Sequence, residues 1–388
     1  MMNRVLLLCF VLTIALPFAA HASNKLQPLP DVQSLDIQTF VSQSAEINKT
    51  FDEDPYLNFK VQIPKAFTEQ NESVLKNYMK DGRLYGEVYR ANGPIVEDVY
   101  PYFSVKTYPL ERAISAKNWL ISNVLKSSQT LRSIESKDKG SEFEALIVRF
   151  DELGNTEVVR SKGYLKGARI IVAEYVVPVM LWNEQRDYQT YAIKSFELTG
   201  VADNQSVENM LSYIYMESFS MKYPETWRMT AENKNDENRL DVSFITADAL
   251  KVPFATIDVT LVADQSIKDL VDRSRYVTNL PQIIEARKKA VLDTDMVIGD
   301  VMERRTYDLS FTPDLQITEI YPLRKKLTDY VTHKQAPVSR EFWITVIKGS
   351  AESGKNYVVS MVAPARGESI DNWAIAAKSY EMMVESLQ

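Results

Sequence analysis

Histidine and cysteine, on which much enzyme and metal chemistry depends, are almost absent from this sequence. It contains two histidines, His21 and His333, and one cysteine, Cys9. A zinc site of the usual kind needs several nitrogen or sulfur ligands. A Ser-His-Asp triad would have to use His333, and no Gly-x-Ser-x-Gly turn is present to supply its serine. We therefore expect His333 to be a solvated loop residue, and we expect no metal site.

Phosphate-binding loops are missing as well. The sequence has 12 glycines, but none is spaced as Gly-x-Gly-x-x-Gly or as a Walker-type loop. Acidic groups at 52–54 and 293–295 do not follow the spacing of an EF-hand loop, and we interpret them as solvated turns. The sequence thus predicts no cofactor and favours a non-enzymatic protein. A hydrolase that uses paired carboxylates stays open as the weakest alternative.

Two triplets of basic residues are the candidate partner-binding groups. They are Arg287, Lys288, Lys289, Arg324, Lys325 and Lys326. The first triplet belongs to an amphipathic helical stretch, where a charged solvent face is expected in any case. Either triplet could contact an acidic partner or the anionic surface of a membrane. The net charge of −7 is mild for 388 residues and argues against nucleic-acid binding.

The first residues follow the order of a secretory signal peptide. Arg4 precedes an apolar run over 5–16, and Ala20-His21-Ala22 fits the small-residue rule for cleavage. The run is shorter than the ~20 apolar residues that a membrane span needs. We therefore expect a signal peptide over 1–22, cleavage after Ala22, and a periplasmic or secreted mature protein. Cys9 would leave with this peptide, so the mature chain would contain no cysteine.

Behind this leader, the same structural signals occur twice in the same order. An alternating strand runs into proline, with an aromatic residue three positions later, in FKVQIPKAF (59–67) and in FSMKYPETW (219–227). Proline cannot donate a ladder hydrogen bond and ends the strand, and the aromatic ring can then fold back onto the core. A β-rich run opened by Pro101 or Pro253 follows in each copy.

The later signals also come in pairs. Helical periodicity covers 111–127 in the first copy and 265–277 in the second. FEALIVRF from Phe143 matches RRTYDLSF from Arg304 as a further strand. AEYVVP and VSMVAP then close the two units, and a helix with a Lys-Ser-aromatic triplet follows each of them.

This repetition predicts one domain used twice. We expect a flexible N-terminal segment over 23–50 with a short helix in it, a first domain over 51–200 and a second over 206–388. The polar stretch TGVADNQS would separate the two domains. The second domain is longer, and we interpret 312–340 as an insertion that forms a β-hairpin or a loop.

The paired motifs resemble those of the PsbP-like superfamily. LNFKVQIPKAF and ESFSMKYPETW look like its F-x-x-x-x-P-x-x-W entry strand, and AIKSFEL and AAKSYEMM are similar to its closing helix. That group includes the photosystem II extrinsic subunit, DcrB-like periplasmic proteins and a Ran-binding nuclear import factor. The resemblance implies an α+β fold of two tandem domains, each an antiparallel sheet flanked by helices in an α/β/α sandwich. It transfers no catalytic residue.

We therefore expect a non-enzymatic accessory or assembly factor that contacts an unknown protein of the cell envelope. The alternative is a carrier that holds a small ligand or lipid in a pocket between sheet and helices. The residues that the two copies share are packing and turn residues. Functional differences should therefore lie in what the copies do not share, chiefly 312–340.

Overall fold

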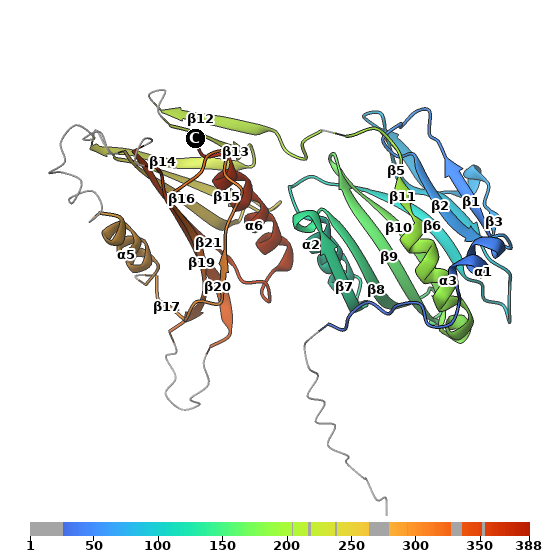
Figure 1. The fold of residues 1–388 in the computed structure, drawn as a ribbon. Helices are drawn as coiled ribbons and strands as arrows, with labels where there is room; N and C mark the ends of the chain where they lie inside the picture. Colours follow the sequence, from blue (N-terminus) through green and yellow to red (C-terminus); the bar gives the residue numbers. More distant parts are fainter. Residues whose placement is uncertain are drawn as a thin grey trace, which may run out of the picture.

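The computed structural model describes residues 26–388 except 204, 216–218, 237–238, 264–278, 293, 327–335 and 351–353. It contains two large antiparallel sheets, one in each half of the chain, with helices packed on them (Figure 1). The predicted α+β class with two sheet-and-helix units is confirmed. The predicted signal peptide, the helical stretch 265–277 and His333 lie outside the described residues.

The first sheet has the strand order β3-β5-β6-β10-β9-β8-β7, and β4 pairs with β5. Its strands are β3 (Thr68–Glu69), β4 (Asn77–Lys80), β5 (Arg83–Asn92), β6 (Tyr102–Pro109), β7 (Thr130–Lys137), β8 (Glu142–Phe150), β9 (Thr156–Lys166) and β10 (Arg169–Pro178). The helices of this half are α1 (Ile37–Gln43), η1 (Glu72–Val74), α2 (Ala116–Lys126), η2 (Asp138–Gly140), η3 (Val179–Leu181) and α3 (Trp182–Ser195). A small sheet of order β1-β2-β11 lies beside α3, with β1 (Ser44–Lys49), β2 (Phe59–Pro64) and β11 (Glu197–Leu198).

The second sheet has the order β14-β15-β16-β21-β20-β19-β17, and β18 pairs with β19. Its strands are β14 (Trp227–Asp236), β15 (Arg239–Ala247), β16 (Pro253–Ala263), β17 (Met296–Ile298), β18 (Glu303–Arg305), β19 (Leu315–Lys325), β20 (Val338–Lys348) and β21 (Lys355–Pro364). The described helices here are α5 (Asn279–Leu292) and α6 (Ile370–Glu385). The strands β12 (Met210–Tyr215) and β13 (Phe219–Pro224) pair with each other.

The two large sheets follow the same path when their strands are taken by rank. In both, a crossover segment with a helix leaves the sheet after the third strand of the path, and a closing helix follows the fourth. By this rank β6 corresponds to β16, β10 to β21, β9 to β20 and β8 to β19. The repeated order agrees with a duplicated domain.

The entry strands form as predicted and fill the core. Phe59, Val61 and Ile63 of β2 are buried on one face, and β2 ends at Pro64. In the second half, Trp227 is 1% exposed, so its ring does pack in the core. The closing triplets also reach the core, because Phe196 and Tyr380 are each 0% exposed. The first triplet sits at the end of α3, whereas the second lies inside α6.

The segment over 23–50 is ordered where it is described, contrary to the expected flexibility. It contains α1 (Ile37–Gln43) and the strand β1, which pairs with β2 along its full length. The Asp187 carboxylate of α3 accepts hydrogen bonds from the backbone N–H groups of Gln33, Ser34 and Leu35. The polar residues of this segment therefore cap α1 and form hydrogen bonds with α3, and the sequence pattern does not reveal either contact.

Two assignments in the second half are wrong. Residues 312–340 were expected to be an inserted β-hairpin or loop. A hairpin does form, because β19 pairs with β20, but β19 holds the rank of β8 and so belongs to the main sheet and not to an insertion. RRTYDLSF was expected to be the counterpart of β8, but its strand ends at Arg305. The alternating residues Tyr307, Leu309 and Phe311 pack against the core cluster that contains α6 instead. Their alternating pattern therefore reflects the burial of every second side chain and not pairing with a neighbouring strand.

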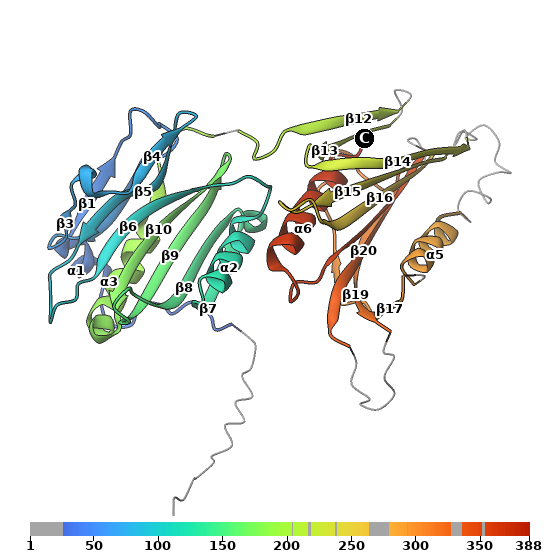
Figure 2. The same cartoon turned by 180° about the vertical axis from the view of Figure 1, so that it is seen from behind.

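The two halves meet where α2 faces α6, as Figures 1 and 2 both show. Ile114, just before α2, is 7% exposed and belongs to the core cluster of the second half. The Asp371 carboxylate of α6 accepts a hydrogen bond from Ser122 and pairs with Lys126 at 2.5 Å. Lys139 pairs with Glu385 at 3.0 Å. Shared apolar packing and ion pairs therefore join the halves.

Candidate functional site

Each half contains a cavity at the corresponding end of its large sheet, on the face that the crossover helix covers. The first cavity has a volume of about 620 Å³ and the second about 480 Å³. Pro178 borders the first cavity, and Val362, two residues before the equivalent Pro364, borders the second. The chemistry of the two linings differs. Two sheets with the same strand order therefore carry a hollow at the same place, lined by different side chains.

The first cavity is lined by a network of paired charges. Arg149 of β8 donates to Glu157 of β9 at 2.8 Å and to the Tyr102 hydroxyl at 2.7 Å, and it lies 3.6 Å from Glu174. Lys106 of β6 donates to Glu174 at 2.8 Å. Ionised groups that share several partners hold one geometry, so this network gives the cavity a rigid polar floor.

This network does not provide the acid and base pair of a hydrolase. Burial by itself would raise the pKa of Glu174, but the charges and hydrogen bonds of Lys106 and Arg149 outweigh it and lower that pKa. An acid catalyst needs a carboxyl whose pKa is raised, so that it carries a proton near neutral pH. The two buried carboxylates that meet here, Glu157 and Glu174, are instead bridged by a common arginine.

Two loops that carry exposed apolar side chains form the mouth of the first cavity. The β5–β6 loop and the β8–β9 turn both border the cavity, as does Pro178 at the start of η3. Six large apolar side chains here are 44–87% exposed, namely Ile95, Val96, Phe150, Leu153, Val179 and Met180. The same loops carry the carboxylates Glu97, Asp98, Asp151 and Glu152 and no basic residue. We call these ten residues the end surface of the first domain.

The tip of the β5–β6 loop holds two acidic residues in a strained backbone conformation. Glu97 has φ +49° and Asp98 has φ +67°, while Val96 and Val99 exchange both backbone hydrogen bonds at 2.8 and 3.1 Å. A two-residue turn with both φ values positive normally uses Asn-Gly or similar residues, because a Cβ is disfavoured there. Such strain persists where other interactions hold it and is found often at functional sites.

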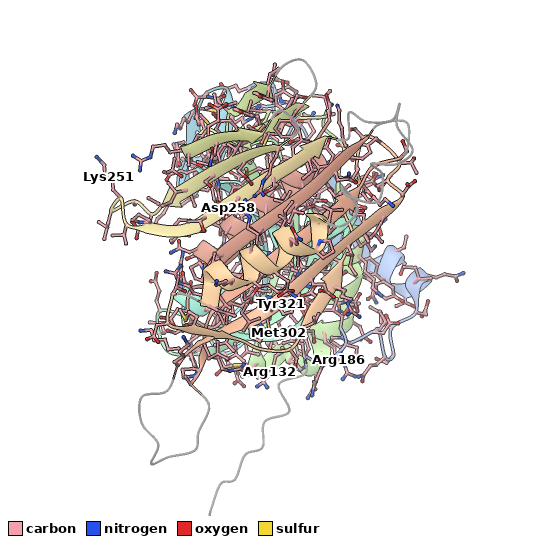
Figure 3. The ribbon with its side chains drawn as sticks, turned by 90° about the vertical axis from the view of Figure 1, so that its left-hand side faces the viewer. Arg132, Arg186, Lys251, Asp258, Met302 and Tyr321 are labelled. Atoms are coloured by element: carbon pink, nitrogen blue, oxygen red, sulfur yellow. The ribbon has the colours of Figure 1, made fainter. Side chains whose placement is uncertain are left out.

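The second cavity lies between α5 and the sheet and is largely apolar. Leu323 of β19, Phe342 of β20 and Val291 of α5 form its floor and roof, and they are 0%, 1% and 7% exposed. Figure 3 looks onto this face, where α5 crosses in front of the sheet and Asp258 and Tyr321 are labelled on either side of the helix.

Three charged side chains line the second cavity, and two of them neutralise each other. Arg287 of α5 lies 3.3 Å from Asp258 of β16 and 3.3 Å from Asp241 of β15, and it donates to the Thr260 hydroxyl at 2.8 Å. Arg340 of β20 lines the same cavity and is exposed. Among the residues that the structure describes, it has no ion pair and no side-chain hydrogen bond. Arg340 is therefore a cation available to a ligand.

The basic triplets predicted as partner-binding groups come together around this cavity. Lys326, at the end of β19, donates to the backbone oxygen of Leu292 at the end of α5, at 3.4 Å. Arg287 is held by the two carboxylates, and Lys288 contacts Glu285 at 3.7 Å and the ring of Tyr321 at 5.3 Å. Within the described chain, the exposed Lys289 and Lys325 and the partly buried Arg324 have no partner, and none of these three lines the cavity.

Sequence reasoning missed several residues that the structure singles out. Asp54, interpreted as part of a solvated turn, is 0% exposed and accepts two hydrogen bonds from Arg169, at 2.5 and 2.9 Å. Arg340 gave no signal, because an isolated arginine at a strand end is common. The strain at Glu97 and Asp98 is a property of the backbone. In the sequence, Glu97 and Asp98 form an acidic pair between Pro94 and Pro101, and this pattern predicts a turn but no strain.

Across the described part of the chain, no three His, Cys, Asp or Glu side chains converge in a way that could hold a metal ion. None of the helices described is long and apolar enough to cross a membrane.

No protein-family model matches the sequence, and a search of curated proteins returned no match. The solution structure of cyanobacterial PsbP from Synechocystis sp. PCC 6803 is 16% identical, and the match covers 49% of this chain and 98% of that one with a TM-score of 0.28. A crystal structure from Bacteroides thetaiotaomicron is 11% identical over 45% of this chain and 55% of that one, with a TM-score of 0.24. The di-domain ARO/CYC StfQ from the steffimycin biosynthetic pathway is 8% identical over 78% of this chain and 79% of that one, with a TM-score of 0.12. Over about half of its length the chain is thus similar to a PsbP protein, while its α+β class rests on its own two sheets.

Proposed function

We propose that this chain is a non-enzymatic, exported accessory protein of the cell envelope that binds a protein partner through the end surface of its first domain. The observation that supports this proposal is the tip of the β5–β6 loop. Two consecutive carboxylates, Glu97 and Asp98, are held there at positive φ beside exposed apolar side chains. Neither the strain nor the exposure contributes to the stability of the chain itself, so both fit a recognition role.

The composition of the end surface defines the partner. Large apolar side chains with a rim of charge are typical of protein interaction sites, where apolar contacts supply affinity and charges supply specificity. All four charged residues of the end surface are acidic. The partner segment should therefore be apolar and basic. An anionic membrane would be repelled by the same carboxylates.

Site-specific photocrosslinking in intact envelopes tests this proposal. A photoreactive residue replaces Leu153, which is 87% exposed at the tip of the β8–β9 turn. The matched control is Leu250, which is 84% exposed. It stands in a turn of the same design, because Asp248 accepts from the N–H groups of Leu250 and Val252 as Asp151 accepts from those of Leu153 and Asn155. We expect a discrete protein adduct from position 153 and none from position 250.

The variant Glu97→Asn/Asp98→Gly completes the test. It keeps the turn but removes both carboxylates and the strain, so the adduct from position 153 should weaken at least about tenfold if the two charges contribute. A soluble Lys/Leu peptide should compete with the partner, and a Glu/Leu peptide of the same length should not. Equal adducts at positions 153 and 250, or an adduct indifferent to the double variant, would refute the proposal.

A second candidate function, a carrier for a small ligand or lipid, is favoured by one specific observation. The apolar cavity of the second half has an arginine without an ionic partner among the described residues. Carriers and accessory proteins are compatible roles here, because the end surface and this cavity belong to different halves of the chain.

A further inference from the structure

We infer that the cavity of the second domain binds a single-chain amphiphile with an anionic head group, which Arg340 contacts. This inference concerns the half of the chain that the proposed protein contact does not use. It rests on the second candidate function, the carrier, and deepens it by naming the site and the class of ligand.

The apolar part of the cavity provides the place for a hydrocarbon chain. Phe342, Leu323 and Val291 are almost fully buried, and Val362 and Met296 complete the lining. A volume of about 480 Å³ lies within the usual range of small-molecule sites, roughly 300–1,000 Å³. Removing a hydrocarbon chain from water favours binding in proportion to the apolar area that is buried. A ligand with a hydrocarbon chain would therefore gain most of its affinity from contacts with this apolar lining.

The charge balance of the lining selects an anion. Asp258 carries one negative charge, and Arg287 and Arg340 carry one positive charge each. Arg287 is committed to Asp258 and Asp241, so the charge of Arg340 is left over at the mouth. A guanidinium group binds carboxylate and phosphate oxygens through two parallel N–H donors. A cationic or neutral head group would leave it unpaired.

The basic residues around the mouth of the cavity also favour an anionic ligand. Lys289 and Lys325 are exposed, and Lys326 is anchored to the end of α5. Basic residues beside a cavity raise the local concentration of anions and speed their association. The basic triplets thus gain a role in guiding the ligand, and Arg340 is the residue that would contact it.

Titration calorimetry on the full mature chain tests this inference. The probes are decanoate, decanoyl lysophosphatidylglycerol, decanol and inorganic phosphate. We expect both anionic amphiphiles to bind, and decanol and inorganic phosphate to bind at least about tenfold more weakly. Preference for decanoate would indicate a free fatty acid, and preference for the lysolipid would indicate a membrane-derived ligand. Comparable binding of decanol and decanoate, or binding of phosphate alone, would overturn the inference.

Three variants sharpen the result. Arg340→Gln should weaken decanoate binding at least about tenfold and leave decanol unaffected. Arg228→Gln, at an exposed arginine of β14 that does not line the cavity, controls for net charge and should bind as the wild type does. Ala290→Phe should fill the mouth from α5 and weaken both anionic probes with all charges intact. Equal losses for Arg340→Gln and Arg228→Gln would refute a specific site. Glu97→Asn/Asp98→Gly should bind decanoate normally, so failure here is distinct from failure of the protein contact.

Discussion

Glu157 and Arg340 occupy equivalent positions in the two halves of the chain. Glu157 of β9 is in register with Pro178, and Arg340 of β20 is in register with Pro364, the prolines that close the two units. The first is tied to Arg149 at 2.8 Å, whereas the second has no ionic partner among the described residues. The same position of the two sheets thus holds a carboxylate in an ion pair in one half and an unpaired guanidinium in the other.

This difference predicts opposite consequences of removing the two side chains. Glu157→Ala should lower the free energy of unfolding by about 1–3 kcal/mol, because it deprives the half-buried Arg149 of a charged hydrogen-bond partner. Arg340→Gln should change it by less than about 0.5 kcal/mol, as is usual for an exposed residue. Urea unfolding followed by tryptophan fluorescence measures both. A large loss for Arg340→Gln would show that this residue is structural.

The buried pair of Asp54 and Arg169 should be the most sensitive ionic contact of the first half. Both side chains are 0% exposed, and Asp54 also accepts from the Leu84 backbone N–H at 2.9 Å. Asp54→Ala leaves an uncompensated buried guanidinium, so we expect a loss of about 3–5 kcal/mol in the free energy of unfolding. The exposed pair of Lys60 and Glu197 is the control, and Glu197→Ala should leave the free energy of unfolding almost unchanged. Equal losses would contradict this account.

Glu208 should couple the two halves. Its carboxylate accepts from the Ala113 N–H at 2.7 Å and from the Thr226 hydroxyl, and it lies 3.5 Å from Arg112. Glu208→Ala removes all three contacts from a buried site, and we expect a loss of about 2–3 kcal/mol. In calorimetry we expect one unfolding transition for the wild type and two for Glu208→Ala. Glu225→Ala, at an exposed neighbour, should leave one transition; if both variants do so, Glu208 is not the coupling residue.

The N-terminal segment should loosen in acid because of Asp187. Burial alone would raise the pKa of this carboxyl, but its hydrogen bonds from Ser34, Leu35 and Gln33 lower it below the ordinary value. The stabilisation is therefore present above the unfolded pKa of about 3.9 and is lost as the pH falls through the lowered folded value. Asp187→Asn should reduce the melting temperature at pH 7 and flatten its decline below about pH 4. Asp52→Asn, at an exposed site, should leave the profile unchanged.

Relieving the strain at the β5–β6 tip should stabilise the chain. Asn and Gly adopt positive φ at lower cost, so Glu97→Asn/Asp98→Gly should gain about 1–2 kcal/mol. Gly154 gives a control of opposite sign, because its φ is +86° and a Cβ there would meet nothing within 4 Å. Gly154→Ala should therefore lose about 1 kcal/mol through backbone strain alone. Thermal unfolding measures both. A destabilised double variant would mean that the carboxylates stabilise the loop.

Local patterns predicted the elements that depend on neighbouring residues. The alternation of Phe59, Val61 and Ile63 and the proline after them specify a half-buried strand and its end, and the second copy repeats this pattern. The same reasoning misplaced β19 as part of an insertion. Its burial is continuous from Ile320 to Leu323, so it lacks the alternation that identifies a strand, and only its two neighbours in the sheet give it a place.

The sequence by itself determined an α+β chain with two sheet-and-helix units, because strand and helix periodicities and proline breaks act over a few residues and occur twice. Only the tertiary structure decided which charged side chains form ion pairs and which are free to bind a ligand. Asp54 meets Arg169 across 115 positions of the chain, and Arg287 meets Asp241 across 46. Arg340 has no such partner among the described residues. Pairing over these separations depends on how the sheets and helices pack, and no local pattern of residues records it.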